Sequence, residues 1–235
     1  MKKGPHPGRI APGPMSEAPK PAATVVVIRD ASERLEVLLL ERNVGEGAWV
    51  FPGGRIEAVD RALASDDLGE AARRAAVREA SEEAALELSR EALVPISRWI
   101  TPKVSRRRYD TWFFLCSVER DVEVRVDGSE IRSHRWLEAP DALAAHDRGE
   151  MPLAPPTFVT VSWLADHARA AEAIQSLARA PYLTFRPRIH RTPDGACILY
   201  PEDAGYKANE MERPGPRHRL WMLQEGWRYE RTPGG

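Results

Sequence analysis

Residues 53–86, GGRIEAVDRALASDDLGEAARRAAVREASEEAAL, decide how the rest of the sequence is interpreted. From about residue 68 to residue 88 the chain is rich in Ala, Glu and Arg and, beyond its second residue, free of Gly and Pro, which predicts a helix. Glu79, Glu82 and Glu83 are spaced i, i+3 and i+4, so their carboxylates share one helical face. Like charges repel there, and we expect a cation to compensate.

Oxygen ligands of this kind suit a hard ion, so we expect Mg²⁺ or Mn²⁺ as the cofactor, with a diphosphate substrate supplying further oxygens. The preceding segment 51–54, FPGG, would let a backbone carbonyl approach the ion. Arg78 could hold one carboxylate in place. The alternative for the helix alone is a solvated charged face.

The same residues resemble the box of the Nudix hydrolases, which reads G-x5-E-x7-R-E-U-x-E-E-x-G-U with U aliphatic. Here Glu70 is followed, after seven residues, by REASEEAAL at 78–86. The match departs in two places: fifteen residues instead of five separate Gly54 from Glu70, and Ala85 stands where the box has glycine. We expect the insertion to form a surface loop and Ala85 to alter how the helix ends.

The resemblance implies roles for individual residues. The Gly54 carbonyl, Glu79 and Glu83 are the implied metal ligands, with Glu82 as a further ligand or the group that activates water. Glu70 is expected to be structural. A carboxylate from a later loop often joins the site in this family, and Glu130 is the nearest match, although an ordinary turn glutamate is an equal alternative. The candidate catalytic residues are therefore Arg78, Glu82, Glu83 and Glu130.

Segments outside the box, at 98–102, 106–114 and 153–157, are similar to the Nudix branch that includes the peroxisomal coenzyme A diphosphatases. That resemblance implies coenzyme A or acyl-CoA as substrate, cut to 3′,5′-ADP and a phosphopantetheine product. Arg106, Arg107 and Arg108 are candidates for binding a substrate phosphate, the alternative being a solvated loop. Trp49, just before the Gly-Gly loop, is a further candidate for substrate contact.

Three other functions stay open. The same chemistry could act on ADP-ribose, NADH or a dinucleoside polyphosphate. A Nudix-fold domain could sense a nucleotide without cutting it, but such domains commonly lose box carboxylates that are all present here. A structural α/β domain ranks last because it leaves the box spacing as coincidence.

Outward from the box, strands are expected at 23–29, 35–41, 49–51, 98–101, 109–118, 122–126 and 131–137, with the first two forming a hairpin. Helices are expected at 140–148 and 156–179, and a small β region follows residue 182. The fold class is α/β (α+β), a Nudix-type α/β/α sandwich with a mixed sheet and a C-terminal helical and β extension. The expected divisions are a disordered tail at 1–22, a core at 23–150 and an appendage at 151–235.

Bulk properties narrow the partners. A net charge of -1 and a pI of about 6.6 give no field to hold nucleic acid, so a small nucleotide-like molecule is the expected partner. No segment suggests a membrane span or a secretory signal. The sequence ends TPGG, without a peroxisomal Ser-Lys-Leu signal, and a cytoplasmic location is expected. The helix after Pro156 and the β tail could form a homodimer interface or a substrate lid.

Overall fold

The computed structural model describes residues 18–43 and 48–232. Most of the expected tail lies outside these ranges, but its last residues belong to the first strand, which begins at Lys20. The expected hairpin is confirmed, with Ile28 opposite Val37 and Asp30 opposite Leu35. The elements of the larger sheet are β1 Lys20–Asp30, β2 Leu35–Arg42, β3 Trp49–Val50, β4 Gly53–Arg55, β5 Val94–Ile100, β6 Tyr109–Ser117, β7 Ile131–Glu138 and β8 Leu183–Phe185.

This eight-stranded sheet is mixed. Its order is β3-β2-β1-β6-β5-β8, with β4 paired to β1 and β7 paired to β2. The β1–β6 and β5–β8 pairs are parallel, and the other pairs are antiparallel. The central strands are buried on both faces, which explains why they read as nearly continuous apolar runs.

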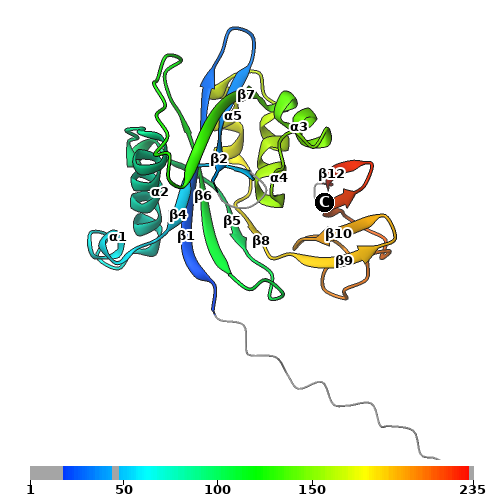
Figure 1. Cartoon of the computed structure of the whole chain (residues 1–235). Coiled ribbons are helices and arrows are strands. Elements are labelled where there is room, and N and C mark those ends of the chain that lie inside the picture. The colour runs from blue at the N-terminus through cyan, green and yellow to red at the C-terminus, as the bar shows by residue number, and fades with distance from the viewer. Residues whose placement is uncertain (1–17, 44–47, 233–235) are drawn as a thin grey trace, which may run out of the picture.

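Alternation along the central strands separates two apolar layers, because successive side chains of a strand point to opposite faces. Val25 and Val27 pack toward α2 (Leu68–Ala84), whereas Val26 and Ile28 pack toward α3 (Ala139–Asp147), α4 (Pro155–Leu164) and α5 (Ala170–Arg179). Figure 1 shows α2 on one side of the sheet and the other three helices on the opposite side. The expected α/β/α sandwich with a mixed sheet is confirmed.

Helix α2 presents a row of small side chains to the sheet. Its N-terminus is capped by Asp67, whose carboxylate accepts from the backbone N–H groups of Gly69 and Glu70 at 2.8 and 3.0 Å. Alanines on the inner face let the helix backbone come close to β1 and β4, and this approach places the glutamate face beside the Gly-Gly strand. The buried alanines are Ala71, Ala72, Ala75, Ala76, Ala80 and Ala84.

The insertion before α2 is not simply a surface loop, as the sequence suggested. It contains a short helix, α1 (Ala58–Ala62), whose Asp60 is buried. The Asp60 carboxylate accepts from the guanidinium of Arg78 on α2 at 3.1 Å. The insertion and α2 therefore form one packed unit on this side of the sheet.

The expected strand at 122–126 is wrong, although its alternation is meaningful. Val122, Val124 and Val126 are half-buried against the layer that holds α2. The backbone N–H of Arg125 donates to the carbonyl of Ala84 at the end of α2, at 3.1 Å. The period of two thus reflects one buried face, but the neighbour is a helix end and not a strand.

The single helix expected over 156–179 is two helices, α4 (Pro155–Leu164) and α5 (Ala170–Arg179). The turn between them docks on the β1–β2 hairpin. The N–H of Leu35 donates to the carbonyl of Ala168 at 2.9 Å, and the Asp30 carboxylate accepts from the N–H of Ala170 at 2.8 Å. These contacts outweigh the helical periodicity. Helix α3 (Ala139–Asp147) matches its expectation closely.

The C-terminal region forms a second, four-stranded sheet in the order β12-β11-β10-β9. It lies beyond β8 on the side of α4, as Figure 1 shows. Its strands are β9 Arg188–Thr192, β10 Gly195–Leu199, β11 His218–Leu223 and β12 Gly226–Arg231. Along the described part of the chain, no helix has the length and apolar character needed to cross a membrane.

Candidate active site

The Gly-Gly strand β4 lies in close contact with β1 and α2. A Cβ on Gly54 would come within 3.0 Å of the Glu79 carboxylate, and a Cβ on Gly53 would come within 3.0 Å of Thr24 and of the Ala23 carbonyl. Only glycine fits at either position without a shift of the backbone or of Glu79. The sequence FPGG is therefore explained by space.

Arg78 joins three carboxylates. Its guanidinium donates to Glu79 Oε1 and Glu82 Oε2 at 2.8 Å each, and to Asp60 Oδ2 at 3.1 Å. It also donates to the backbone carbonyl of Arg55 at 3.0 Å. Burial alone would lower the pKa of Arg78, but hydrogen bonds to Asp60 and the charge of Glu79 raise it above its ordinary value. Arg78 is thus a fixed cation that orients Glu79 and Glu82.

Glu83 is set apart from the other two glutamates. It is 5% exposed, and its Oε2 accepts from the backbone N–H of Gly53 at 2.9 Å. Burial raises the pKa of Glu83 to about 7; the Gly53 N–H opposes this rise, and the negative charge of Glu79 adds to it. Among the residues described, no cation lies within ion-pair distance of its carboxylate. Burial also raises the pKa of Glu79, and Arg78 only partly offsets it.

The loop before β7 brings Glu130 to the same place. Its backbone N–H and that of Ile131 donate to the Asp127 carboxylate at 2.9 Å each, while its carbonyl accepts from the Asn43 N–H at 2.7 Å. The backbone N–H of Glu130 and the hydroxyl of Ser129 lower the pKa of Asp127 to about 2. Asp127 therefore fixes the loop that carries Glu130.

These residues surround a cavity of about 420 Å³, called here the carboxylate cavity. Four carboxylates and three guanidinium groups line it, so acidic groups outnumber basic ones. Glu83, whose carboxylate accepts from the Gly53 N–H, does not line the cavity. The lining residues are Ala22, Thr24, Arg42, Gly53, Gly54, Arg55, Glu57, Arg78, Glu79, Glu82, Tyr109, Thr111 and Glu130.

A second cavity, of about 430 Å³ and called here the basic pocket, adjoins the first. Arg55 and Tyr109 line both cavities. Arg106 and Arg107 are exposed, and Arg108 is half-buried with its Nε donating to the Thr101 carbonyl at 3.2 Å. The sequence expected these three arginines to act together, and the structure brings them to one pocket. Its lining is Ala18, Lys20, Arg55, Arg106, Arg107, Arg108 and Tyr109.

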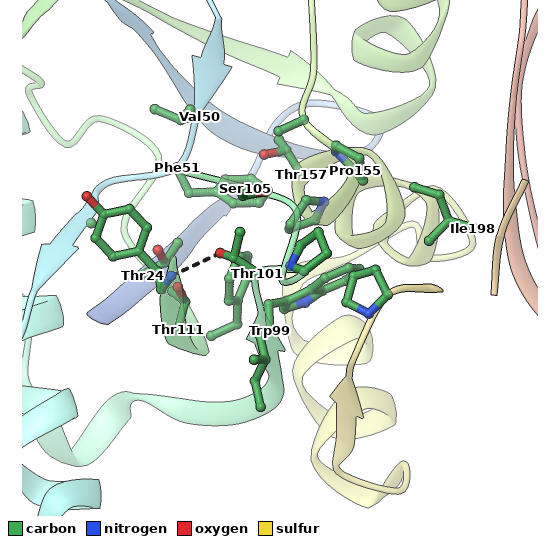
Figure 2. A pocket seen from close by; sticks show the side chains of 18 of the residues that line it. Thr24, Val50, Phe51, Trp99, Thr101, Ser105, Thr111, Pro155, Thr157 and Ile198 are labelled. Carbon is green, nitrogen blue, oxygen red and sulfur yellow. Dashed lines mark hydrogen bonds between the residues drawn. The ribbon is translucent and has the colours of Figure 1, made fainter. Parts of the chain in front are cut away.

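A third cavity, of about 420 Å³, also adjoins the carboxylate cavity and is called here the apolar cavity. Thr24, Arg42, Gly53, Tyr109 and Thr111 line both of these cavities. Figure 2 shows its labelled side chains converging from different parts of the chain, with Phe51 and Trp99 from the core, Pro155 and Thr157 from α4, and Ile198 from β10. Two of its lining residues are joined by a hydrogen bond of 3.0 Å from the Tyr109 backbone N–H to the Thr101 hydroxyl, drawn as the dashed line in Figure 2.

The structure brings together most of the residues expected from the sequence, with one exception. Trp49 is 4% exposed, and its backbone N–H donates to the Pro152 carbonyl at 3.0 Å. The Arg135 guanidinium lies over its ring. It packs in the core and lines none of the three cavities within the described ranges, so the expected substrate contact does not fit its position. Its large apolar ring is satisfied by packing instead.

Three residues at the site were missed. Asp60 belongs to the insertion, and its only signal was an acidic residue three positions after Glu57 at a helix start. Tyr109 lines all three cavities, and Arg42 joins two of them while its Nη2 lies 3.9 Å from Glu130 Oε2. Neither residue belongs to the box, and strand register alone places them here.

Across residues 18–43 and 48–232, no group of three or more His, Cys, Asp or Glu side chains is arranged to hold a metal ion as it stands. Arg78 draws Glu79 and Glu82 together, and the Gly53 N–H holds Glu83 away from them. The donor chemistry nevertheless fits a hard cation, because it consists of oxygens with acidic groups in excess. Gly54 adjoins Glu79 in the same cavity.

With this fold and this site described, comparison with known proteins gives the family. The NUDIX domain model matches residues 18–156, more than half of the chain, and the chain belongs to this family. It is similar to a NUDIX hydrolase from Alicyclobacillus acidocaldarius of known structure, with a TM-score of 0.63 and 26% identity over 70% of this chain and 99% of that one.

The chain is also similar to two curated relatives, both named acyl-coenzyme A diphosphatase NUDT19. The Homo sapiens protein is 28% identical over 57% of this chain and 38% of its own length. The Xenopus laevis protein is 33% identical over 60% of this chain and 40% of its own length. This chain therefore matches about two fifths of the length of either relative.

Proposed function

We propose that this protein is a divalent-metal-dependent hydrolase that cleaves the diphosphate linkage of coenzyme A or an acyl-CoA. The observation that carries the proposal is the junction of the carboxylate cavity with the basic pocket through Arg55 and Tyr109. One compartment suits a metal-bound diphosphate, and the other suits a further phosphate close by. The names of the two curated relatives support the same substrate class.

Charge requires a cation in the proposed reaction. A diphosphate is an anion, and the carboxylate cavity already has four carboxylates against three guanidinium groups. Such a substrate would be repelled unless Mg²⁺ or Mn²⁺ accompanied it. We propose Gly54, Glu79, Glu82 and Glu83 as the residues that hold the ion. To contact the ion, the Glu83 carboxylate must turn away from the Gly53 N–H. Otherwise it contributes only its negative charge, next to Glu79.

The bound ion would supply charge neutralisation at the phosphate oxygens and would lower the pKa of an attacking water. The protein's own groups prepare this arrangement. Arg78 keeps Glu79 and Glu82 oriented, and it cannot lose its proton near neutral pH. Arg55 lies where the carboxylate cavity meets the basic pocket, and Arg42 lies where it meets the apolar cavity. Both guanidinium groups are placed to receive negative charge on the substrate.

Glu82 and Glu130 are the two candidates for the group that takes the proton of the attacking water. Both line the cavity, with side chains 59% and 70% exposed. Glu82 is held by Arg78 at 2.8 Å, whereas the nearest cation to Glu130 is Arg42 at 3.9 Å. The looser pairing leaves the Glu130 side chain freer to turn toward an attacking water, and we therefore favour it. Glu130→Gln should then reduce kcat more than Glu82→Gln does.

The test is an incubation with Mg²⁺ or Mn²⁺ and a panel of coenzyme A, acetyl-CoA, ADP-ribose, NADH and diadenosine polyphosphates, with products identified by mass. Metal-dependent release of 3′,5′-ADP from coenzyme A is the expected result. Glu83→Gln should abolish it, and Glu91→Gln is the matched control because Glu91 has a 77% exposed side chain outside the three cavities described.

Two other results would change the conclusion. Release of AMP from ADP-ribose or NADH, with coenzyme A untouched, would keep the chemistry and overturn the substrate. Binding of these compounds without turnover would favour a nucleotide sensor. The presence of Arg78, Glu79, Glu82 and Glu83 in one connected site is the reason to favour catalysis over sensing.

A further inference from the structure

The apolar cavity has a wall that lies outside the family match. The match ends at residue 156, whereas Pro187, Ile189 and Ile198 come from the C-terminal sheet and the segment leading into it. Ile189 and Ile198 are directly opposite each other on β9 and β10. Side chains of directly opposed residues project from the same face of a sheet, so the pair forms one apolar surface toward the cavity.

The character of the cavity changes along its length. Where it meets the carboxylate cavity, its lining is polar, with Thr24, Thr111 and Arg42. Away from that border, aromatic, aliphatic and proline side chains take over, among them Trp99 and Ile198. A ligand that passes from one cavity to the other thus leaves an ionic environment and enters an apolar one.

Its walls are also rigid. Pro155 and Pro156 begin α4, and Pro102 and Pro187 line the cavity from two other segments. Proline fixes the backbone φ angle, so these walls lose little conformational freedom when a ligand binds. A volume of about 420 Å³ falls within the range of small-molecule sites, roughly 300–1,000 Å³.

The aromatic wall does not suit a nucleotide base. Trp99 is 4% exposed, and its ring is stacked on Phe185 at 3.8 Å with an interplanar angle of 3°. The ring centroids of Phe113 and Tyr200 lie 6.2 and 5.6 Å from that of Trp99, in a tilted and a T-shaped arrangement. Trp99 is therefore a packed wall and not an open platform for stacking. The anionic nucleotide end of a diphosphate substrate has a better place in the basic pocket, which adjoins the carboxylate cavity through Arg55 and Tyr109.

We propose that the apolar cavity binds the acyl chain of an acyl-pantetheine group and that Ile189, from the C-terminal sheet, determines specificity for it. The proposal rests on the proposed function, because it assigns the second half of the same substrate. Ile189 is 47% exposed, so it is accessible to a ligand without unfolding. The C-terminal sheet then selects the substrate, while the carboxylate cavity performs the reaction.

The test uses pantetheine and octanoyl-pantetheine, which lack the diphosphate, with the full chain and without divalent metal. Calorimetry should show octanoyl-pantetheine binding at least about tenfold more tightly than pantetheine, because the chain transfers apolar surface from water. Ile189→Asn should reduce that ratio by about threefold to tenfold. Leu63→Asn is the matched control and should leave the ratio unchanged. Leu63 is 62% exposed and directly follows α1, which Figure 1 shows at the other end of the molecule from β9 and β10.

Equal binding of the two compounds to the wild-type protein, or an unchanged ratio in Ile189→Asn, would overturn the proposal. Thermal unfolding of each variant establishes that it is folded. Hydrolysis of coenzyme A by the wild-type protein is measured in parallel and reports on the proposed function alone. Acyl-dependent binding without hydrolysis would keep this inference and remove the proposed reaction, and the reverse pattern would do the opposite.

Discussion

Asp60 and Arg78 form a two-point contact, with Oδ2 of Asp60 3.1 Å from Nη2 of Arg78 and Oδ1 3.4 Å from Nε. The carboxylate comes from the insertion that interrupts the family box, and the guanidinium comes from the box itself. The insertion therefore supplies a support for the arginine that orients Glu79 and Glu82. The ten additional residues of the insertion therefore contribute to the site, because they include the carboxylate that holds Arg78.

Asp60→Asn should destabilise the protein and weaken its activity. The variant weakens the pairing of a buried charge and the acceptor of the Glu57 N–H, which we expect to cost about 1–3 kcal/mol of unfolding free energy. Urea unfolding measures this loss, and initial rates report on the orientation of the glutamates. Asp66→Asn, an exposed residue of the same insertion, should change neither; equal effects of the two variants would exclude a specific role for Asp60.

The basic pocket should distinguish coenzyme A from dephospho-coenzyme A. In the double variant Arg106→Ala, Arg107→Ala we expect the KM for coenzyme A to rise by about tenfold, because two charge-assisted contacts to the extra phosphate are lost. The KM for dephospho-coenzyme A should change by less than about twofold. Lys103→Ala, in the same loop but outside the pocket, is the control. A parallel rise for both substrates would remove the phosphate from this pocket.

Ala85→Gly should stabilise the protein. Ala85 ends α2 with φ 55° and ψ 33°, a left-handed conformation that costs an L-residue about 1–2 kcal/mol relative to its right-handed form. Its side chain is exposed, so glycine loses no packing, and we expect a gain of about 0.5–1 kcal/mol in urea unfolding after the entropy of the unfolded chain is counted. Ala180→Gly, at the end of α5 with φ -66°, should instead destabilise slightly.

The contribution of His218 to stability should fall with acidification below about pH 6.5, in opposition to Glu83 and Glu79, whose pKa values are raised in the folded protein. Burial lowers the pKa of His218, whose Nδ1–H donates to the Pro201 carbonyl at 2.6 Å and whose Nε2 is buried without a partner in the described structure. The folded protein keeps this ring neutral, whereas the unfolded chain takes up a proton as pH falls through about 6.5. The contribution of His218 to the free energy of unfolding therefore decreases, by at most about 1.4 kcal/mol per pH unit for one proton.

His218→Asn keeps a donor for Pro201 and removes the titrating ring. Urea unfolding of both proteins at pH 5.5 and 7.5 gives the comparison. On going from pH 7.5 to pH 5.5, the wild-type protein should lose more, or gain less, unfolding free energy than the variant. An identical pH dependence in the two proteins would assign the acid sensitivity to other groups, such as His146, whose pKa is also lowered by burial.

Local patterns predicted much of this molecule. The hairpin, α2 with its glutamate face and the alternating apolar strands follow from spacing alone, because a residue's neighbours in a helix or strand are fixed by its period. The Gly-Gly segment was recognisable as a place of close backbone approach, and the structure shows that the close neighbour of Gly54 is the Glu79 carboxylate. These features carry the family resemblance.

Features set by distant contacts could not be predicted in the same way. The break after Leu164 depends on hydrogen bonds from the β1–β2 hairpin, and the burial of Trp49 depends on how Arg135 of β7 lies over its ring. The valines at 122–126 alternate like a strand because one side of them is buried, yet their neighbour is the end of α2. A period of two in the sequence shows which side chains are buried, but it does not identify the element that buries them.

Strand β8 is three residues long and lies beside β5 at the end of the large sheet. Trp99 of β5 is opposite Phe185 of β8, and their rings are stacked. A chain cut at residue 156, where the family match ends, would leave β5 with unpaired backbone groups and an uncovered tryptophan. Such an edge pairs readily with other chains. By pairing with β5, the C-terminal region covers this edge, and we expect the truncated chain to self-associate more readily than the full one.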